Sequence, residues 1–129
     1  MNTKQQIVIF SVERSNLSKE ENAMNTRVVN RLLKDNDFNF MTCKGVFQGV
    51  SEDSFAVILD DYSQVQVLHE LSRVYNQDCI LYLDSNNVGY LYNNNGTVDR
   101  IGKSRQVTKE VAMTKDAYTI INNNYYLVD

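Results

Sequence analysis

One short stretch of the chain holds the side chains that are best suited to form a binding site. Glu52 and Asp53 form an acidic pair, and Gly45, Phe47 and Gly49 precede them. Glycine lets the backbone bend or lets a ligand approach the chain closely. We therefore expect one wall of any ligand site here. The alternative is an ordinary hairpin whose glycines serve only the turn.

Other kinds of catalytic site find little support in the sequence. His69 is the only histidine, so a Ser-His-Asp triad is possible only through it. It falls in the middle of a predicted helix with no nucleophile motif nearby, and we expect it to be a surface or half-buried helix residue. Cys43 and Cys79 are the only cysteines, and two cysteines make no zinc site. We expect both thiols to be reduced and buried, and we expect no metal site.

The composition is that of an ordinary globular chain, which we expect to form a single domain over residues 1–129. A net charge of −3 and a pI near 5.1 give no attraction to nucleic acid or to anionic membranes. The apolar runs are too short to span a bilayer. The segment from Met1 to Gln6 has one lysine and leads directly into a strand, so we expect no signal peptide and a cytoplasmic location.

The first strand and the first helix have clear local signals. Residues 7–12 form a continuous β-rich run, which is typical of a strand that is buried on both faces. Ser18 and Glu21 have the spacing of a capping box, and the helix that follows is expected to end near Lys34.

A second helix and several further strands are predicted in the rest of the chain. Ser63 and Gln66 have the spacing of a second capping box. Residues 97–116 carry much of the remaining charge and are interpreted as an irregular excursion with at most one strand. The other predicted strands lie within 38–59 and at 79–83, 88–92, 117–121 and 125–128.

The predicted order is βαββαβ with extra strands at the C-terminal end. Two βαβ units of this kind interleave in a ferredoxin-like sheet, so we expect an α+β fold with both helices on one face. The other face would stay exposed unless something packs against it. The tyrosines of the C-terminal part suit an oligomer interface there, although half-exposed strand tyrosines are also common. They are Tyr90, Tyr92, Tyr118, Tyr125 and Tyr126.

Several segments carry a family resemblance. Residues 11–22 read Ser-Val-Glu-Arg-Ser-Asn-Leu-Ser-Lys-Glu-Glu-Asn, a strand that runs into a polar loop and an acidic helix start. The other segments are Asn76 to Tyr82, Gly89 to Tyr92, Ala117 to Ile120 and Tyr125 to Val128. In order and spacing these segments resemble the phage S-adenosylmethionine lyases, long described as SAM hydrolases. The resemblance covers nearly the whole chain.

The resemblance implies a small homotrimer similar to PII-like signalling proteins, with S-adenosylmethionine (SAM) bound in the clefts between subunits. The implied reaction splits SAM into 5′-methylthioadenosine and homoserine lactone, because the carboxylate of SAM attacks its own γ-carbon and displaces the thioether. The alternative is attack by water, which gives homoserine. The nucleophile and the leaving group both belong to SAM, so the protein need only hold it in a reactive shape, and no cofactor is expected. An acidic residue on the α-ammonium would hold the carboxylate in place.

The same resemblance assigns roles to five residues. The acidic position falls on Glu52, which would otherwise be a solvated turn glutamate. The aromatic position falls on Phe47, where related sequences can carry a tyrosine whose hydroxyl is lost here. Gln77 matches a glutamine that could meet SAM across a subunit boundary, or its amide could cap the second helix. Asn22 and Ser15 match as well, and Asn22 is expected to fix the first loop, with substrate contact as the alternative.

Three kinds of function follow from these considerations. The first is an enzyme that degrades SAM and so blocks SAM-dependent restriction by a host. The second is a non-catalytic trimer of the same fold that binds or sequesters a nucleotide or nucleoside. The third is a structural oligomeric protein. Incubation with SAM and detection of methylthioadenosine would separate the first from the other two.

Overall fold

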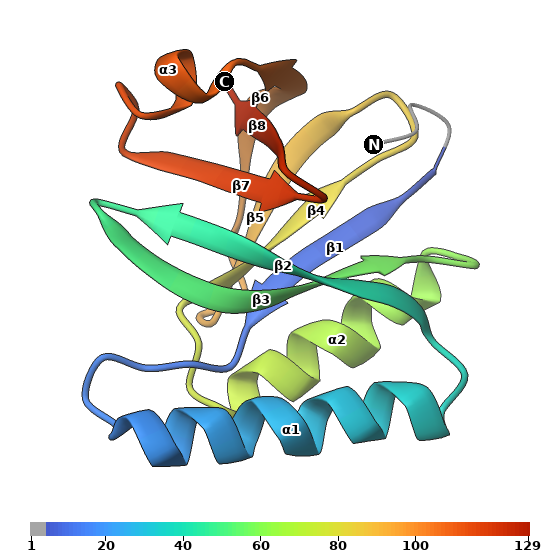
Figure 1. Cartoon of the computed structure of the whole chain (residues 1–129). Helices are drawn as coiled ribbons and strands as arrows, with labels where there is room; N and C mark the ends of the chain where they lie inside the picture. The colour runs from blue at the N-terminus through green and yellow to red at the C-terminus, as the bar shows by residue number, and fades with distance from the viewer. Residues whose placement is uncertain (1–4) are drawn as a thin grey trace.

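A computed structural model describes residues 5–129, in which eight antiparallel strands close into a barrel (Figure 1). Around the barrel the strands follow the order β1, β3, β2, β7, β8, β6, β5 and β4, and β4 pairs with β1 to close it. The elements are β1 Ile7–Ser11, α1 Lys19–Asp35, β2 Asn39–Phe47, β3 Val50–Ile58, α2 Ser63–Val74, β4 Cys79–Leu83, β5 Val88–Asn93, β6 Val98–Val107, α3 Lys109–Ala112, β7 Ala117–Ile121 and β8 Asn124–Val128.

The prediction of a ferredoxin-like, PII-like sheet is wrong. The first six elements do follow the order β1, α1, β2, β3, α2 and β4. The later strands are not an appendage to them, however, because β5 pairs with β4 and β7 pairs with the end of β2. Lys44 of β2 lies opposite Ile120 of β7, which joins two distant parts of the chain. The sheet therefore closes on itself, and the face that was expected to be exposed becomes the interior of the barrel.

Alternate residues of the same strands supply two separate hydrophobic cores. Ile7 and Ile9 of β1 belong to the core inside the barrel, whereas Val8 and Phe10 belong to the core beneath the helices. The two-residue period of a strand explains this division. All five residues of β1 are buried, so the prediction of a strand that is covered on both faces is confirmed.

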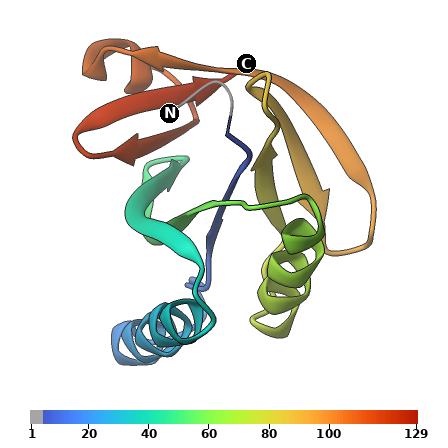
Figure 2. The ribbon, with the colours of Figure 1, turned by 90° about the vertical axis from the view of Figure 1, so that its right-hand side faces the viewer.

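The helices α1 and α2 lie on the same side of the barrel and cover the outer surface of β1, β3 and β4 (Figures 1 and 2). Val29 and Leu33 of α1 are fully buried in this core. The predicted capping box of α1 is confirmed. The Ser18 hydroxyl accepts from the N–H of Glu21, and the Glu21 carboxylate accepts from the N–H of Ser18.

Two local predictions are wrong further along the chain. Helix α2 begins after Tyr62, whose side chain makes no capping hydrogen bond, and the carboxylate of Asp61 accepts from the N–H of Ser63 at 2.8 Å instead. Residues 97–116 are not an irregular excursion, because β6 and α3 occupy most of them. The first part of β6 pairs with β5 and its last part pairs with β8, so this strand is part of the barrel wall.

The C-terminal tyrosines are packed within the chain and do not gather on one exposed face. Tyr126 is buried inside the barrel, and Tyr90 and Tyr92 pack against the core beneath the helices. The rings of Tyr118 and Tyr125 lie against each other, with centroids 6.0 Å apart. The aromatic argument for an oligomer interface therefore fails, because barrel closure removes the exposed sheet face on which it depended.

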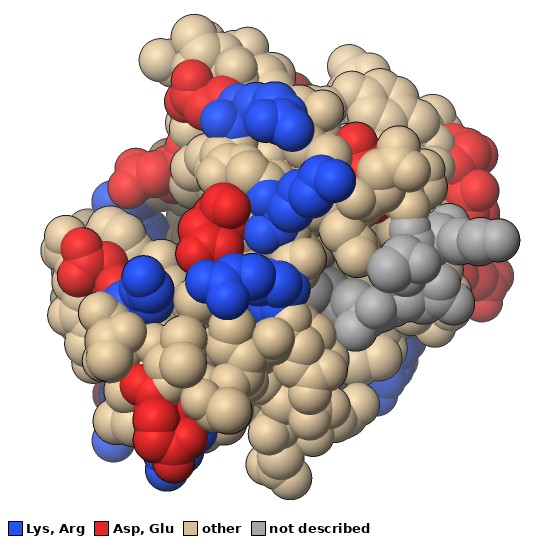
Figure 3. All heavy atoms as spheres, turned by 90° about the horizontal axis from the view of Figure 1, so that it is seen from above, with Lys and Arg blue, Asp and Glu red and all other residues tan. Residues whose placement is uncertain are grey.

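The surface carries charges of both signs. The face that Figure 3 views from above shows lysine and arginine side chains next to aspartate and glutamate. Arg105 of β6 donates two hydrogen bonds to the carboxylate of Asp129, at 2.8 and 2.9 Å. Within residues 5–129 no helix is long and apolar enough to cross a bilayer.

Candidate active site

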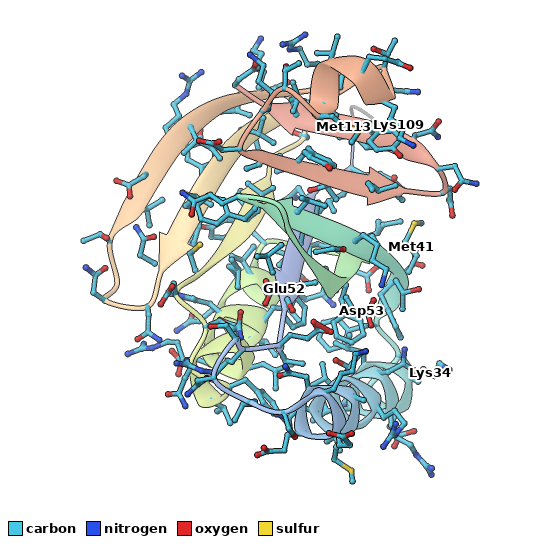
Figure 4. The ribbon with its side chains drawn as sticks, turned by 60° about the vertical axis from the view of Figure 1, so that its left-hand side comes forward. Lys34, Met41, Glu52, Asp53, Lys109 and Met113 are labelled. Atoms are coloured by element: carbon cyan, nitrogen blue, oxygen red, sulfur yellow. The ribbon has the colours of Figure 1, made fainter. Side chains whose placement is uncertain are left out.

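Glu52 lies inside strand β3 and not in the connection where the sequence pattern placed it. It pairs in register with Gly45 of β2, and by alternation it shares the inward side of β3 with Ala56. Asp53, the next residue of β3, points to the other side of the sheet and forms an ion pair with Lys44 (Figure 4). The Glu52 side chain is half-buried, and the glycine opposite leaves room beside it.

Glu13 is the residue of this site that sequence reasoning missed. It follows the last residue of β1 by two positions, and the hydroxyl of that residue, Ser11, connects it to β3. Ser11 donates to the carbonyl of Asp53 at 2.9 Å and accepts from the N–H of Glu13 at 3.0 Å. The carboxylates of Glu13 and Glu52 are consequently near enough to repel each other. The alternation of β1 puts residue 13 on the inward side, but only the register with β3 shows its neighbour.

The surroundings of both carboxyl groups disfavour their ionised forms. Burial raises the pKa of Glu52 above its ordinary value, and the charge of Glu13 raises it further. Burial also raises the pKa of Glu13, and the charge of the Asp53 carboxylate raises it further. The N–H of Asp53 and the charge of Lys44 act in the opposite direction and lower the pKa of Glu13. An electronegative and partly desolvated pair of this kind favours a bound cation.

Gln77 lies between α2 and β4 and reaches the site from a third element. Its side-chain amide donates to the main-chain carbonyl of Glu13 at 2.9 Å. Its main-chain N–H donates to the carbonyl of Ser72 at 3.0 Å, so the backbone of Gln77, and not its amide, closes the end of α2. The fold thus brings Gln77, Glu13 and Glu52 together within one chain.

The other three predicted residues lie on α1, in the loop after β1 and at the tip of the β2–β3 hairpin. Asn22 of α1 exchanges two hydrogen bonds of 2.9 Å with the main chain of Arg14, which holds the loop after β1 against the helix. Ser15 is exposed in the same loop. Phe47 ends β2 on the same side as Gly45, and it is 60% exposed at the tip of the hairpin. A substrate contact by Ser15 or Phe47 stays a prediction.

The single histidine and the cysteines lie elsewhere. His69 is half-buried on α2, as expected, and its Nε2 lies 3.0 Å from the carbonyl oxygen of Asn93. Cys43 and Cys79 are free thiols. Cys43 is buried as expected, and burial raises its pKa to about 11, whereas the prediction that Cys79 is buried is wrong, because that side chain is half-buried at the start of β4. Among the described residues, no three histidine, cysteine, aspartate or glutamate side chains are grouped in a way that could hold a metal ion.

Two hollows in the described chain are separate from the acidic pair. A cavity of about 190 Å³ lies at the opposite end of the barrel, beside Ile7, Met41 and Asn122. A groove of about 320 Å³ runs along α2 and is lined by His69 and Tyr92 among others. Neither is lined by Glu13 or Glu52, which lie at the rim of the barrel where β1 ends and the β2–β3 hairpin turns.

Comparison with known proteins decides the class of reaction. The model of the S-Adenosylmethionine lyase family matches residues 8–129. The chain belongs to this family. The match includes Glu13, Glu52 and Gln77, and the resemblance predicted from short segments is confirmed. No curated protein matches this SAM lyase. Of the three kinds of function considered above, the family supports the enzyme, with S-adenosylmethionine lyase activity.

Proposed function

We propose that this SAM lyase converts SAM into 5′-methylthioadenosine and homoserine lactone. A carboxylate oxygen of SAM forms a bond to the γ-carbon, the bond from that carbon to sulfur breaks, and its electron pair goes to sulfur. The carboxylate and sulfonium charges disappear together, and the α-ammonium stays on the lactone. The observation that carries the proposal is the half-buried pair of Glu13 and Glu52, which suits a cationic substrate.

Glu52 serves this reaction best on the α-ammonium of SAM. The ammonium has the same charge before and after the step, so holding it does not oppose the chemistry. A carboxylate beside the sulfonium would stabilise a charge that the reaction removes, and would raise the barrier. Holding the ammonium places the α-carboxylate near the γ-carbon, where intramolecular attack has a high effective concentration. Because nucleophile and leaving group both belong to SAM, this step uses no cofactor.

We propose further that the enzyme is a homotrimer with SAM bound between subunits. Sites for ligands of this size are concave and enclose most of the ligand, whereas neither hollow described above is lined by the acidic pair at the barrel rim. Phe47 and Val50 face each other across the hairpin tip beside this rim, and they are 60% and 61% exposed. An apolar tip of this kind favours cover by another chain. A second copy would supply both the cover and the missing wall.

We propose that the biological effect is the removal of SAM from a host cell by a phage enzyme, in the host cytoplasm. Restriction systems that need SAM would then fail to act on incoming DNA. Expression of the enzyme in a bacterium with such a system should raise the plating efficiency of an unmodified phage, and Glu52→Gln should not. Equal plating efficiency with and without active enzyme would contradict this role.

Product analysis in H₂¹⁸O tests the chemical proposal. Attack by the substrate's own carboxylate gives homoserine lactone without ¹⁸O at early times, together with methylthioadenosine. Attack by water gives homoserine with ¹⁸O in the γ-hydroxyl group. Later opening of the lactone at its carbonyl puts ¹⁸O in the carboxyl group, so fragment masses separate the two routes. Label in the γ-hydroxyl would overturn the proposed step.

A further inference from the structure

We infer that Glu13 is a second substrate-binding carboxylate of this SAM lyase and that Gln77 positions it. The inference rests on the proposed function, because it assigns Glu13 to the same α-ammonium as Glu52. Three elements converge on this point of the barrel rim. Glu13 follows β1, Glu52 lies in β3, and Gln77 lies between α2 and β4.

The main chain of Glu13 is fixed on both sides. The Ser11 hydroxyl accepts from its N–H at 3.0 Å, and the Gln77 amide donates to its carbonyl at 2.9 Å. The same hydroxyl donates to the carbonyl of Asp53, so the loop is tied to β3 next to Glu52. The N–H of Asp53 lowers the pKa of the Glu13 carboxyl group, which places this carboxylate beside the main chain of β3. A carboxylate has about four acceptor positions, so capacity remains for a ligand cation.

The side chains around this pair of carboxylates supply too little positive charge to neutralise it. Lys44 attracts Glu13, but its ammonium is ion-paired with Asp53. Two half-buried carboxylates that repel each other gain most from a cation placed between them. An ammonium group has three N–H donors and can bond to both. Contact with carboxylates from two elements fixes the rotation of the ammonium as well as its position, and so directs the α-carboxylate at the γ-carbon.

Gln77 acts on the substrate through Glu13 in this arrangement. Gln77→Ala removes the donor that holds the Glu13 carbonyl. It should lower kcat/KM for SAM, as Glu13→Gln does, but by a smaller factor. In a Glu13→Gln background it should add little, because the group that it positions has already lost its charge. A full additional loss in that background would show that Gln77 contacts SAM directly, and would overturn its role as a positioning residue.

The inference specifies a substrate that carries an α-ammonium as well as the sulfonium. A SAM analogue with a hydroxyl group in place of the α-amino group keeps the sulfonium, the carboxylate and the adenosine. Wild-type enzyme should use it with a kcat/KM about 100-fold or more below that for SAM. Glu13→Gln should reduce this discrimination by about 10-fold, because the variant gains less from the ammonium. A merely structural Glu13 would affect both substrates equally.

Steady-state kinetics with SAM and this analogue test the inference on wild type, Glu13→Gln, Glu52→Gln and Glu70→Gln. Glu13→Gln should raise KM for SAM by about 10-fold or more. Glu70→Gln is the matched control, because its carboxylate is paired with Arg73 on α2 and acts on neither Glu13 nor Glu52, and it should stay within about 3-fold of wild type.

The outcomes distinguish the inference from the proposed function. If wild type releases no methylthioadenosine from SAM, the proposed function is wrong. If wild type is active and Glu13→Gln keeps both its kcat/KM and its discrimination, the inference is wrong and the proposed function stands. Should Glu13→Gln lack a cooperative melting transition, Glu13→Asp replaces it. That variant keeps the charge but draws it back by one methylene group, and a kcat/KM equal to wild type would overturn the inference.

Discussion

At the scale of single residues, the charge of Glu52 is the first test of the mechanism. Glu52→Gln keeps the shape of the side chain and removes the charge that we propose to pair with the α-ammonium. Loss of a desolvated charge pair should slow methylthioadenosine release by about 100-fold or more, while the adenosine contacts still allow SAM to bind. Chromatographic measurement of methylthioadenosine over time gives the rate, and isothermal titration gives the affinity.

The neighbouring carboxylate provides the control for this prediction. Asp53→Asn changes the adjacent position of β3 but removes a carboxylate that is paired with Lys44. If Glu52→Gln works at nearly the wild-type rate, Glu52 does not hold the ammonium. The acidic function would then belong to Asp53 or to Asp78, and a large loss in Asp53→Asn would decide between these two.

The raised pKa values of Glu13 and Glu52 predict how stability depends on pH. A carboxyl group whose pKa is higher in the folded protein than in the unfolded chain binds its proton more tightly when folded. Its contribution therefore favours folding at low pH and is lost as pH rises from the ordinary pKa through the raised one. At neutral pH the ionised pair destabilises the fold, so Glu13→Gln and Glu52→Gln should each raise the melting temperature by a few degrees.

Thermal melts at two pH values check this sign. The gain in melting temperature should nearly vanish at about pH 4, where the carboxyl groups of Glu13 and Glu52 in the folded wild-type protein are largely protonated. A lower melting temperature for both variants at neutral pH would mean that the two carboxylates stabilise the fold, contrary to the direction of their pKa shifts.

At the scale of elements, the two glycines of the β2–β3 hairpin should behave differently. Gln48 and Gly49 both have positive φ angles, of 50° and 80°, as a two-residue type I′ turn requires. Gly49→Ala should lower the free energy of unfolding by about 1–2 kcal/mol with little effect on turnover, because the site keeps its shape. Gly45 instead lies opposite Glu52, and a Cβ there would meet only Ser54 Oγ, at 3.1 Å.

Gly45→Ala should therefore lower activity more than stability. The added methyl group enters the space beside Glu52, and we expect a loss of about 10-fold in kcat/KM with a change in unfolding free energy of under about 1 kcal/mol. Chemical denaturation and SAM turnover on both variants check the contrast. A Gly45→Ala enzyme with full activity would support the alternative in which both glycines serve only the hairpin.

The two helix starts give a second pair of matched variants. Ser18→Ala removes the side-chain oxygen that accepts from Glu21, and should lower the free energy of unfolding by about 1 kcal/mol. Ser63 has the same spacing to Gln66 but is not the N-cap of α2. Ser63→Ala should therefore change the free energy of unfolding by less than about 0.5 kcal/mol. Urea denaturation measures both. Equal losses would mean that Ser63 stabilises α2 as much as a capping residue does.

At the scale of the whole molecule, the enzyme should be a homotrimer in solution. Light scattering after size-exclusion chromatography should give about three times the chain mass of 14.9 kDa. Val50→Asp should lower this mass, because it puts a charge on the apolar hairpin tip beside the site. Val74→Asp is the control, since Val74 is 73% exposed at the end of α2, and it should leave the mass unchanged. A stable monomer at micromolar concentration would contradict the trimer and a site between subunits.

Features that depend on near neighbours in the chain could be predicted from the sequence. The capping box of Ser18 and Glu21 joins residues three apart, and the hairpins at 79–92 and 117–128 are closed by turn residues between their strands. The family could also be predicted, because the order and spacing of short motifs can be recognised without knowledge of the fold. The second capping box failed for an equally local reason. Asp61 offers its carboxylate to the N–H of Ser63, and the Ser63 side chain does not cap the helix.

Strand pairing between distant parts of the chain decided the rest. Alternation along a strand tells which residues share a face, but not which strand lies beside it, so nothing local could show that β7 pairs with β2 and closes the barrel. The same limit hid the site. Glu13 and Glu52 are far apart in the sequence, and only the pairing of β1 with β3 and the bond from Gln77 bring them together. The sequence alone therefore determined the family and the candidate Glu52, whereas the tertiary structure decided the barrel and the second carboxylate, because the register between distant strands exists only in the folded chain.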